Sequence, residues 1–501
     1  MAFALGSMNE LRVGPVMNEL HSAAATGSTR VIAELLSRGL IGINQGDPAG
    51  VTPLIVAASS GHTSAVRTLL QNGASVSSIE TKGCNALHAA SQQGRLDVFH
   101  LLVKAGSDLE ATTFYGYTCL HLAATRGHAH VIKALVAAGA QMDRREQEGR
   151  TALYICAVEG YLEASTVLIQ AGADLEVGND KRCTALHACA HFGNEGIMKA
   201  LIDAGANINS RMEDGRTPLH ACCMGGHVGA VRVLLRAGAN PLLTNRTTPV
   251  NTYVPLDTAV RHGRLEVVRE LIGQLGLWGC TGASGGTEAL RLAAQNNHVE
   301  IIYTLVEAGV EDTGTALVGA IAYGREAPVK VLLQLKEQSG RSTAEYVNTV
   351  ANIGGMLGPP LLLAIGFCRH QPLPRIVRML LDAGADVTST VATRSYELDG
   401  TPLELVTGFI REKEVDGEEA AEEQLHKLEA IRRLLLTVES VHATSWLWRK
   451  DDPHLAHGVA RGKWKTKKTL TPLRMMLPVL RRRARKRGLP SSAMFRFSRK
   501  L

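Results

Sequence analysis

Two adjacent cysteines stand between two histidines in DGRTPLHACCMGGH, the stretch from Asp214 to His227. Cysteine and histidine at such close spacing can bind zinc. A thiolate beside an imidazole can also act as a nucleophile. The stretch alone does not distinguish these two chemistries from a structural role, so the elements that carry the residues must be considered first.

The same pattern returns along the chain with a constant period of 33 residues. The residue that opens each copy is Thr52, Asn85, Thr118, Thr151, Thr184 or Thr217. A glycine column has the same period, at Gly73, Gly106, Gly139, Gly172, Gly205 and Gly238. A constant period of this size indicates an array of stacked repeats.

Each copy predicts a pair of helices. Thr217 followed by Pro218 suits a helix N-cap and first helical position, where proline's missing N–H costs nothing. Gly226 is expected to end this helix, and Gly238 to end a second one. Apolar residues recur at helical spacing: Leu219, Cys222 and Cys223 in the first helix, Val231, Leu234 and Leu235 in the second.

The form G-x-T-P-L-H-x-A-A-x-x-G-H, followed by an apolar run and G-A-D, resembles the ankyrin repeat. The resemblance implies an all-α fold, a solenoid of stacked helix-turn-helix units with hairpin-like loops. It also implies that Thr217 and His220 hydrogen-bond within and between neighbouring loops. The same pair recurs as Thr118 with His121 and as Thr184 with His187.

The cysteines fit this array as packing residues. Cys156, Cys189 and Cys222 occupy the column that holds Ala57, Ala90 and Ala123 in other copies. A free cysteine is a small apolar residue, so we predict buried cysteines without a metal. The sequence also lacks GxSxG, HExxH and a complete P-loop, since GVARGK at 458–463 is one residue short between its glycines. We therefore expect no enzyme activity and no cofactor.

The array continues with drift beyond the regular copies. We expect an N-terminal extension (1–16), a capping repeat (17–47), six regular repeats (48–246), divergent repeats with an acidic loop at 412–423 (247–445) and a basic disordered tail (446–501). In one divergent copy Asn297 stands where glycine ends the first helix, and asparagine is the next-best residue for that conformation. The count is about twelve repeats.

The C-terminal tail differs in charge from the rest of the chain. Residues 446–501 contain seventeen Lys or Arg and two Asp, a net of +15; because the whole chain carries +7, residues 1–445 carry −8. The densest run contains Arg481, Arg482, Arg483, Arg485, Lys486 and Arg487. Three interpretations stay open: recognition by an import receptor, contact with nucleic acid or an anionic surface, and a solvated tail without a specific role.

Composition favours a soluble protein. Nine cysteines without a disulfide-like framework favour a reducing compartment. The first residues lack a basic segment followed by an apolar one, so no secretory signal is expected. The longest apolar run, 356–368, is too short and too broken by proline to span a bilayer. We expect a monomeric intracellular protein, cytoplasmic or nuclear or both.

The resemblance implies a protein-binding scaffold or adaptor that holds another protein on its concave face, formed by hairpin tips and first-helix surfaces. Stacked repeats leave such a surface free for recognition. Candidate positions vary within otherwise fixed columns: Phe114 and Tyr115 at a tip, and Arg126, Glu159, His191, Phe192, Met224 and Arg261 just before the helix-ending glycine. Packing of Phe192 in a local gap, or of Phe114 and Tyr115 on a neighbouring hairpin, stays open. An alternative function is a nuclear or nucleic-acid-associated regulator that uses the basic tail.

Overall fold

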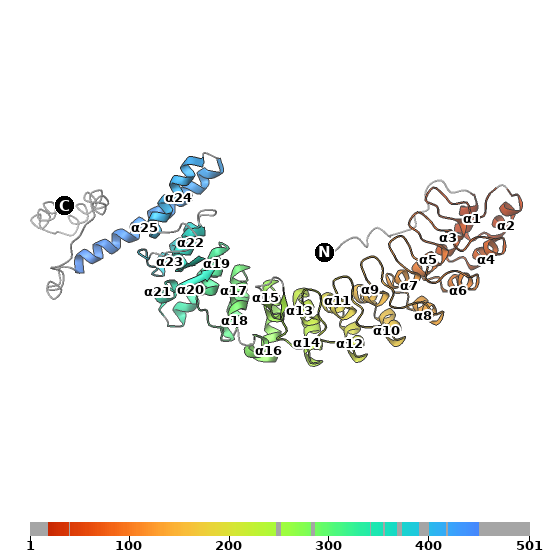
Figure 1. Cartoon of the computed structure of the whole chain (residues 1–501), viewed down its shortest axis with the longest axis horizontal. Coiled ribbons are helices and arrows are strands. Elements are labelled where there is room, and N and C mark those ends of the chain that lie inside the picture. The colour runs from red at the N-terminus through yellow and green to blue at the C-terminus, as the bar shows by residue number, and fades with distance from the viewer. Residues whose placement is uncertain are drawn as a thin grey trace, which may run out of the picture. The chain divides into compact units, whose positions relative to one another are not determined.

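The computed structural model describes residues 19–39, 41–246, 252–281, 286–340, 342–353, 356–367, 373–389, 400–416 and 419–449. Contacts divide the chain into residues 1–432 and 433–501. In the first unit, short antiparallel helix pairs follow one another in chain order (Figure 1). The all-α expectation of stacked helix-turn-helix units is confirmed.

The first seven pairs have nearly equal lengths. They are α1 (Glu19–Thr26) with α2 (Thr29–Ser37), α3 (Pro53–Ser60) with α4 (Thr63–Gln71), α5 (Ala86–Gln92) with α6 (Leu96–Lys104), α7 (Cys119–Ala124) with α8 (Ala129–Ala137), α9 (Ala152–Glu159) with α10 (Leu162–Gln170), α11 (Ala185–Phe192) with α12 (Glu195–Asp203), and α13 (Pro218–Gly225) with α14 (Val228–Arg236).

The later helices are less regular. They are α15 (Pro255–Arg261) with α16 (Leu265–Thr281), α17 (Thr287–Gln295) with α18 (Val299–Glu307), α19 (Thr315–Ala322) with α20 (Glu326–Gln338), the short α21 (Thr343–Val347), α22 (Pro360–Phe367) with α23 (Pro374–Asp382), α24 (Pro402–Asp416) and α25 (Glu419–Arg449). Helix α16 is broken at Gly276, whose φ is 68°. The predicted role of Asn297 is confirmed, since its φ is 64°.

Two antiparallel hairpins interrupt the helices. Strand β1 (Asn245–Arg246) pairs with β2 (Thr252–Tyr253), with Asn245 opposite Tyr253. Strand β3 (Ala351–Ile353) pairs with β4 (Met356–Gly358), with Ala351 opposite Gly358. Each hairpin lies in a connection between helix pairs.

The two helices of a pair are buried to different extents. Each first helix contacts the first helices before and after it, as α11 contacts α9 and α13, and also its own second helix. In α11 all six residues of 185–190 are therefore buried. Helix α12 buries only Ile197, Met198 and Leu201, because its outer side faces solvent. Burial on several sides explains why first helices tolerate small residues such as alanine and cysteine.

The helix starts follow the repeated Thr or Asn. Thr217 is the N-cap of α13, Pro218 is its first residue, and Gly226 ends it with φ 89°. The Thr217 hydroxyl lies 2.9 Å from Nδ1 of His220, whose Nε2 lies 3.0 Å from the carbonyl oxygen of Tyr253 in the next loop. The predicted bonds within and between loops are therefore confirmed for this pair, and for Thr118 with His121 and Thr184 with His187.

The described residues of the acidic segment, 412–416 and 419–423, are helical, so the expectation of a loop there is wrong. Helix α24 runs to Asp416 and α25 begins at Glu419. Glutamate and alanine dominate the segment, and both are good helix formers. The rest of the predicted basic tail, residues 450–501, lies outside the described residues.

Candidate partner-binding surface

The cysteine–histidine cluster is part of the repeat core. Cys156, Cys189 and Cys222 are each 0% exposed, which confirms their predicted burial. Sγ of Cys222 lies 3.2 Å from the carbonyl oxygen of Leu219 in its own helix. Burial raises the pKa of Cys156 to about 12 and that of Cys223 well above its usual value. The thiol form is therefore favoured at neutral pH, and reactive cysteines require the thiolate.

The histidines next to these cysteines are fully engaged by the backbone. Nδ1 of His220 accepts a hydrogen bond from the Thr217 N–H at 3.2 Å, and its Nε2 meets a carbonyl oxygen. Burial lowers the pKa of His220 to about 4. Across the described residues, no group of three His, Cys, Asp or Glu side chains could hold a metal ion. The ring of His220 is used for loop bonding.

A second histidine column ties neighbouring repeats together. Nε2 of His62, His128 and His227 lies 2.9–3.0 Å from a carbonyl oxygen near the end of the preceding first helix, in Ala25, Gln92 and His191 respectively. These bonds fix the positions of the first-helix ends, where most of the sequence-predicted partner-binding residues lie.

The first-helix ends form a row of accessible side chains. Arg126, Glu159 and Phe192 occupy equivalent positions and are exposed, with Phe192 at 50%. Because α7, α9 and α11 contact one another in sequence, the three residues follow one another along the stack. Thr125, Val158 and Glu159 also line a shallow hollow with Tyr117 and Tyr154, two aromatics that sequence reasoning missed.

The candidates one position earlier in the repeat, His191, Met224 and Arg261, contact other side chains of their own repeat. His191 is half-buried and packs edge-on against the ring of Phe192, with centroids 5.0 Å apart. Met224 is half-buried, and its sulfur lies 3.4 Å from Nη1 of Arg216. Arg261 is exposed and lies over the Tyr253 ring at 5.7 Å. Tyr323 lies just beyond the end of α19, at the position equivalent to Phe192, and is 58% exposed. Sequence reasoning missed this aromatic as well.

The aromatic tip is held in place by the loops on either side. The Phe114 N–H donates to the Lys82 carbonyl oxygen at 3.0 Å, and a Cβ on Gly83 would lie 3.0 Å from the Phe114 ring. On the other side, the Gln147 side chain donates to the Phe114 carbonyl oxygen at 2.7 Å. Phe114 nevertheless remains 61% exposed and Tyr115 50%. Phe114 therefore contacts the neighbouring hairpin, and both Phe114 and Tyr115 remain accessible to a partner.

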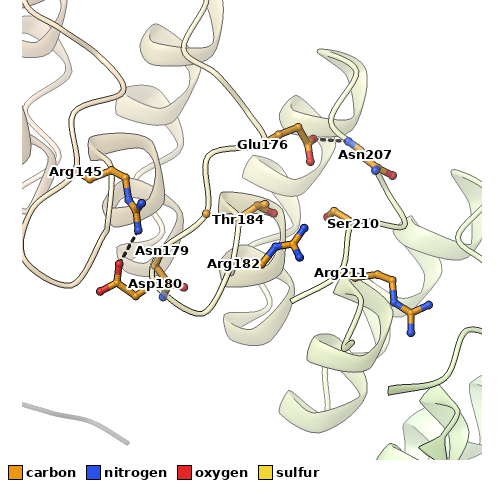
Figure 2. Close-up of a pocket in the computed structure, with 10 residues that line it drawn as sticks. Arg145, Glu176, Asn179, Asp180, Arg182, Thr184, Asn207, Ser210 and Arg211 are labelled. Carbon is orange, nitrogen blue, oxygen red and sulfur yellow. Dashed lines mark hydrogen bonds and ion pairs between the residues drawn. The ribbon is translucent and has the colours of Figure 1, made fainter. Parts of the chain in front are cut away.

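A polar hollow of about 520 Å³, here called the Arg182 hollow, lies between neighbouring hairpin loops. Its lining is drawn in Figure 2: Arg145, Glu176, Gly178, Asn179, Asp180, Arg182, Thr184, Asn207, Ser210 and Arg211. None of these residues is among the sequence-predicted candidates. The sequence does carry a signal for Arg182, because it replaces a repeated glycine. The equivalent positions in the other regular repeats are Gly50, Gly83, Gly116, Gly149 and Gly215.

The basic candidates Arg481, Arg482, Arg483, Arg485, Lys486 and Arg487 lie outside the described residues. Within the part of the chain that the structure describes, no helix is both long enough and apolar enough to cross a membrane.

Comparison with known proteins agrees with the helix-pair architecture. The family model described as "Ankyrin repeats (3 copies)" matches residues 20–113, 105–179, 168–245, 186–280 and 256–344. The chain is similar to the crystal structure of the human ASB11 ankyrin repeat domain, at 25% identity and a TM-score of 0.41, over 45% of this chain and 100% of that one. No curated protein matches. Because the family matches together span more than half of the sequence, the chain belongs to the ankyrin repeat family.

Proposed function

We propose that this protein is a scaffold or adaptor that binds a partner protein on its first-helix ends and hairpin tips. Ankyrin repeats are generally protein–protein interaction modules, and the family is typically a non-catalytic scaffold. The observation that carries the proposal is the exposure of Phe192 at the end of a helix whose first six residues are buried. An exposed aromatic ring on a rigid element is the kind of side chain that dominates binding energy.

The supporting surface extends along several repeats. Phe114 and Tyr115 add two exposed aromatics at a tip, and Arg126 and Glu159 add charges in the same row as Phe192. The histidine rings of the following repeats hydrogen-bond to backbone carbonyl oxygens at the first-helix ends and hold these ends in place. Little conformational entropy is therefore lost when a partner binds.

The test compares two apolar residues of nearly equal exposure. Partners of the full chain are captured by affinity purification and identified by mass spectrometry, and their affinities are then measured for two variants. We expect Phe192→Ala to weaken binding by about 1–3 kcal/mol. Leu162→Ala, at the start of a second helix and 48% exposed, should change it little. Losses concentrated at Leu162 instead would contradict the proposed face.

Charge distribution favours a second candidate function, a regulator whose basic tail contacts nucleic acid or an anionic surface. The tail (446–501) has a net charge of +15, and residues 1–445 have a net charge of −8. Binding of duplex DNA by the full chain should fall steeply with added salt, since each neutralised phosphate releases counterions. Replacing the six basic residues of 481–487 with glutamine should flatten this salt dependence. Equal DNA affinity in the variant would exclude this role for the run.

A further inference from the structure

Arg182 departs from a rule that the other regular hairpins keep. In each of these loops an N–H donates to the carbonyl oxygen four residues on, as Glu146 does to Arg150 and Met212 to Arg216. Asn179 makes the same bond to Cys183 at 3.0 Å, so the turn is unchanged in this repeat. The equivalent glycines have φ between 76° and 81°, and Arg182 has φ 57°. A side chain in this left-handed region is strained.

The turn around Arg182 is held by neighbouring groups. The Asn179 side-chain oxygen accepts from the N–H groups of Lys181 and Cys183, both at 3.0 Å. A Cβ on Gly178 would lie 2.6 Å from the Arg182 backbone, so the two segments approach closely there. Strained residues persist when their surroundings fix them, and they gather at binding sites.

The guanidinium of Arg182 has no hydrogen bond or ion pair within the described residues. Figure 2 shows it directed toward the loop of Ser210 and Arg211 rather than toward Asp180. Asp180 is already paired with Arg145 at 2.6 Å, and Glu176 accepts the Asn207 N–H at 2.7 Å. Both carboxylates that line the hollow are therefore engaged by other residues of its lining, Arg145 and Asn207, and not by Arg182.

Two more groups on the hollow favour an anion. Arg211 donates to the Thr244 carbonyl oxygen, so this contact leaves its positive charge without a carboxylate. The Ser210 hydroxyl is buried and has no hydrogen-bond partner among the described residues. The hollow thus combines two guanidiniums lacking a carboxylate partner with a hydroxyl that can still donate. A guanidinium binds carboxylates and phosphates through two parallel N–H bonds.

We propose that the Arg182 hollow binds an oxyanion side chain of the protein partner, either a phosphorylated residue or a carboxylate, with Arg182 as its main donor. This inference rests on the proposed protein-binding function and adds the chemistry that the partner must present. The strained position of Arg182 brings a planar donor group to a place in the loop where every other regular repeat has a glycine, which has no side chain.

The test uses the full chain and four bead-bound peptide libraries with degenerate flanks. The fixed central residue is phosphoserine, glutamate, glutamine or serine. Affinities of the selected peptides are then measured by fluorescence anisotropy, with each peptide also made with serine at its centre. We expect at least tenfold tighter binding with an anionic centre. Preference for phosphoserine or for glutamate identifies the source of the oxyanion, whereas equal binding of the serine versions would overturn the proposal.

The matched variants place the effect at one side chain. Arg182→Gly restores the residue of the other hairpins, so its thermal midpoint should not fall, yet its affinity for the anionic peptides should fall at least tenfold. Arg182→Lys keeps the positive charge but loses the planar guanidinium. Its affinity for the anionic peptides should lie between those of the unmodified chain and Arg182→Gly. Lys181→Ala removes an exposed charge from the same loop but not from the hollow, and should bind within twofold of the unmodified chain.

Two outcomes keep this inference separate from the proposed function. If Arg182→Gly binds the anionic peptides as tightly as the unmodified chain, the hollow is not their site and the inference is wrong. Partner binding that still depends on Phe192 would then leave the scaffold function intact. If the peptides bind through Arg182 but no captured protein depends on the first-helix ends, the proposed face is wrong while the anion site stands.

Discussion

At the scale of the residue, the recurring histidines have a fixed protonation state. Nδ1 of His220 faces a backbone N–H, which can only donate, and Nε2 faces a carbonyl oxygen, which can only accept. The neutral ring with its proton on Nε2 satisfies both groups. A second proton on Nδ1 would oppose the Thr217 N–H, and burial already lowers the pKa of His187 and His220 to about 4.

Acid should therefore weaken the array through these histidines. An unfolded histidine has a pKa near 6.5, so between about pH 6.5 and 4 the unfolded chain binds more protons than the folded one. The free energy of unfolding should fall as the pH falls through this window, by at most roughly 3 kcal/mol for each such histidine. Urea unfolding at pH 7.5, 6.0 and 5.0 measures the loss. His220→Gln should reduce the pH dependence, and an unchanged slope would contradict this role.

Sequence reasoning was reliable where a residue repeats and weak where it does not. The burial of Cys222 followed from the alanines in its column, because the same packing environment returns every 33 residues. Arg182 escaped notice because its importance lies in a backbone angle and in the lack of a partner. The glycine column points to the backbone angle, because an arginine stands where the other regular copies have glycine, but the lack of a partner is not visible from residue types.

At the scale of the element, the start of a first helix depends on its N-cap residue. Val254 stands where the regular copies have threonine or asparagine, and its backbone is extended in the same way, with ψ 167°. Its N–H donates to Oδ2 of Asp257 at 3.1 Å, but a valine side chain cannot accept from the helix. Helix α15 therefore retains half of the reciprocal cap seen in α13.

Val254→Thr should stabilise α15 by up to about 1 kcal/mol, because threonine is nearly isosteric and can accept from the N–H of Asp257, the third residue of the helix. Val260→Thr is the matched control. It places the same hydroxyl near the end of α15, at a side chain that is 0% exposed, and should destabilise the protein by about 1–3 kcal/mol. Urea midpoints compare the two. A loss of stability in Val254→Thr would show that the cap cannot form there.

Helix boundaries beyond the regular copies were harder to predict. The periodic glycine and threonine or asparagine columns mark each start and stop through Gly238, but they do not continue into the acidic segment 412–423, which has the single Gly417. Its charge suggested a loop, whereas the helix propensity of glutamate and alanine is satisfied in α24 and α25. The β1–β2 hairpin was likewise unpredicted, because two-residue strands leave no periodic pattern.

At the scale of the whole molecule, stability is expected to be local. Each first helix contacts its nearest neighbours, as α13 contacts α11 and α15, so the described helix pairs of the first unit pack mainly on the pairs next to them. In such arrays, stability is approximately a sum of terms for each repeat and for each interface between neighbours. A defect in one repeat should therefore weaken its neighbours most.

Leu201→Ala tests this locality. Leu201 in α12 is 0% exposed, and removing a buried leucine side chain costs about 2–5 kcal/mol. Hydrogen exchange followed by mass spectrometry should show faster exchange in α9–α14, whereas α19 and α20 should exchange as in the unmodified protein, because α12 packs mainly against α10, α11 and α14. Lys199→Ala, on the exposed side of the same helix, should leave exchange unchanged throughout. Equal acceleration in α19 and α20 would mean that the array unfolds as a single cooperative unit, and that the drift of the later repeats has not weakened the coupling between interfaces.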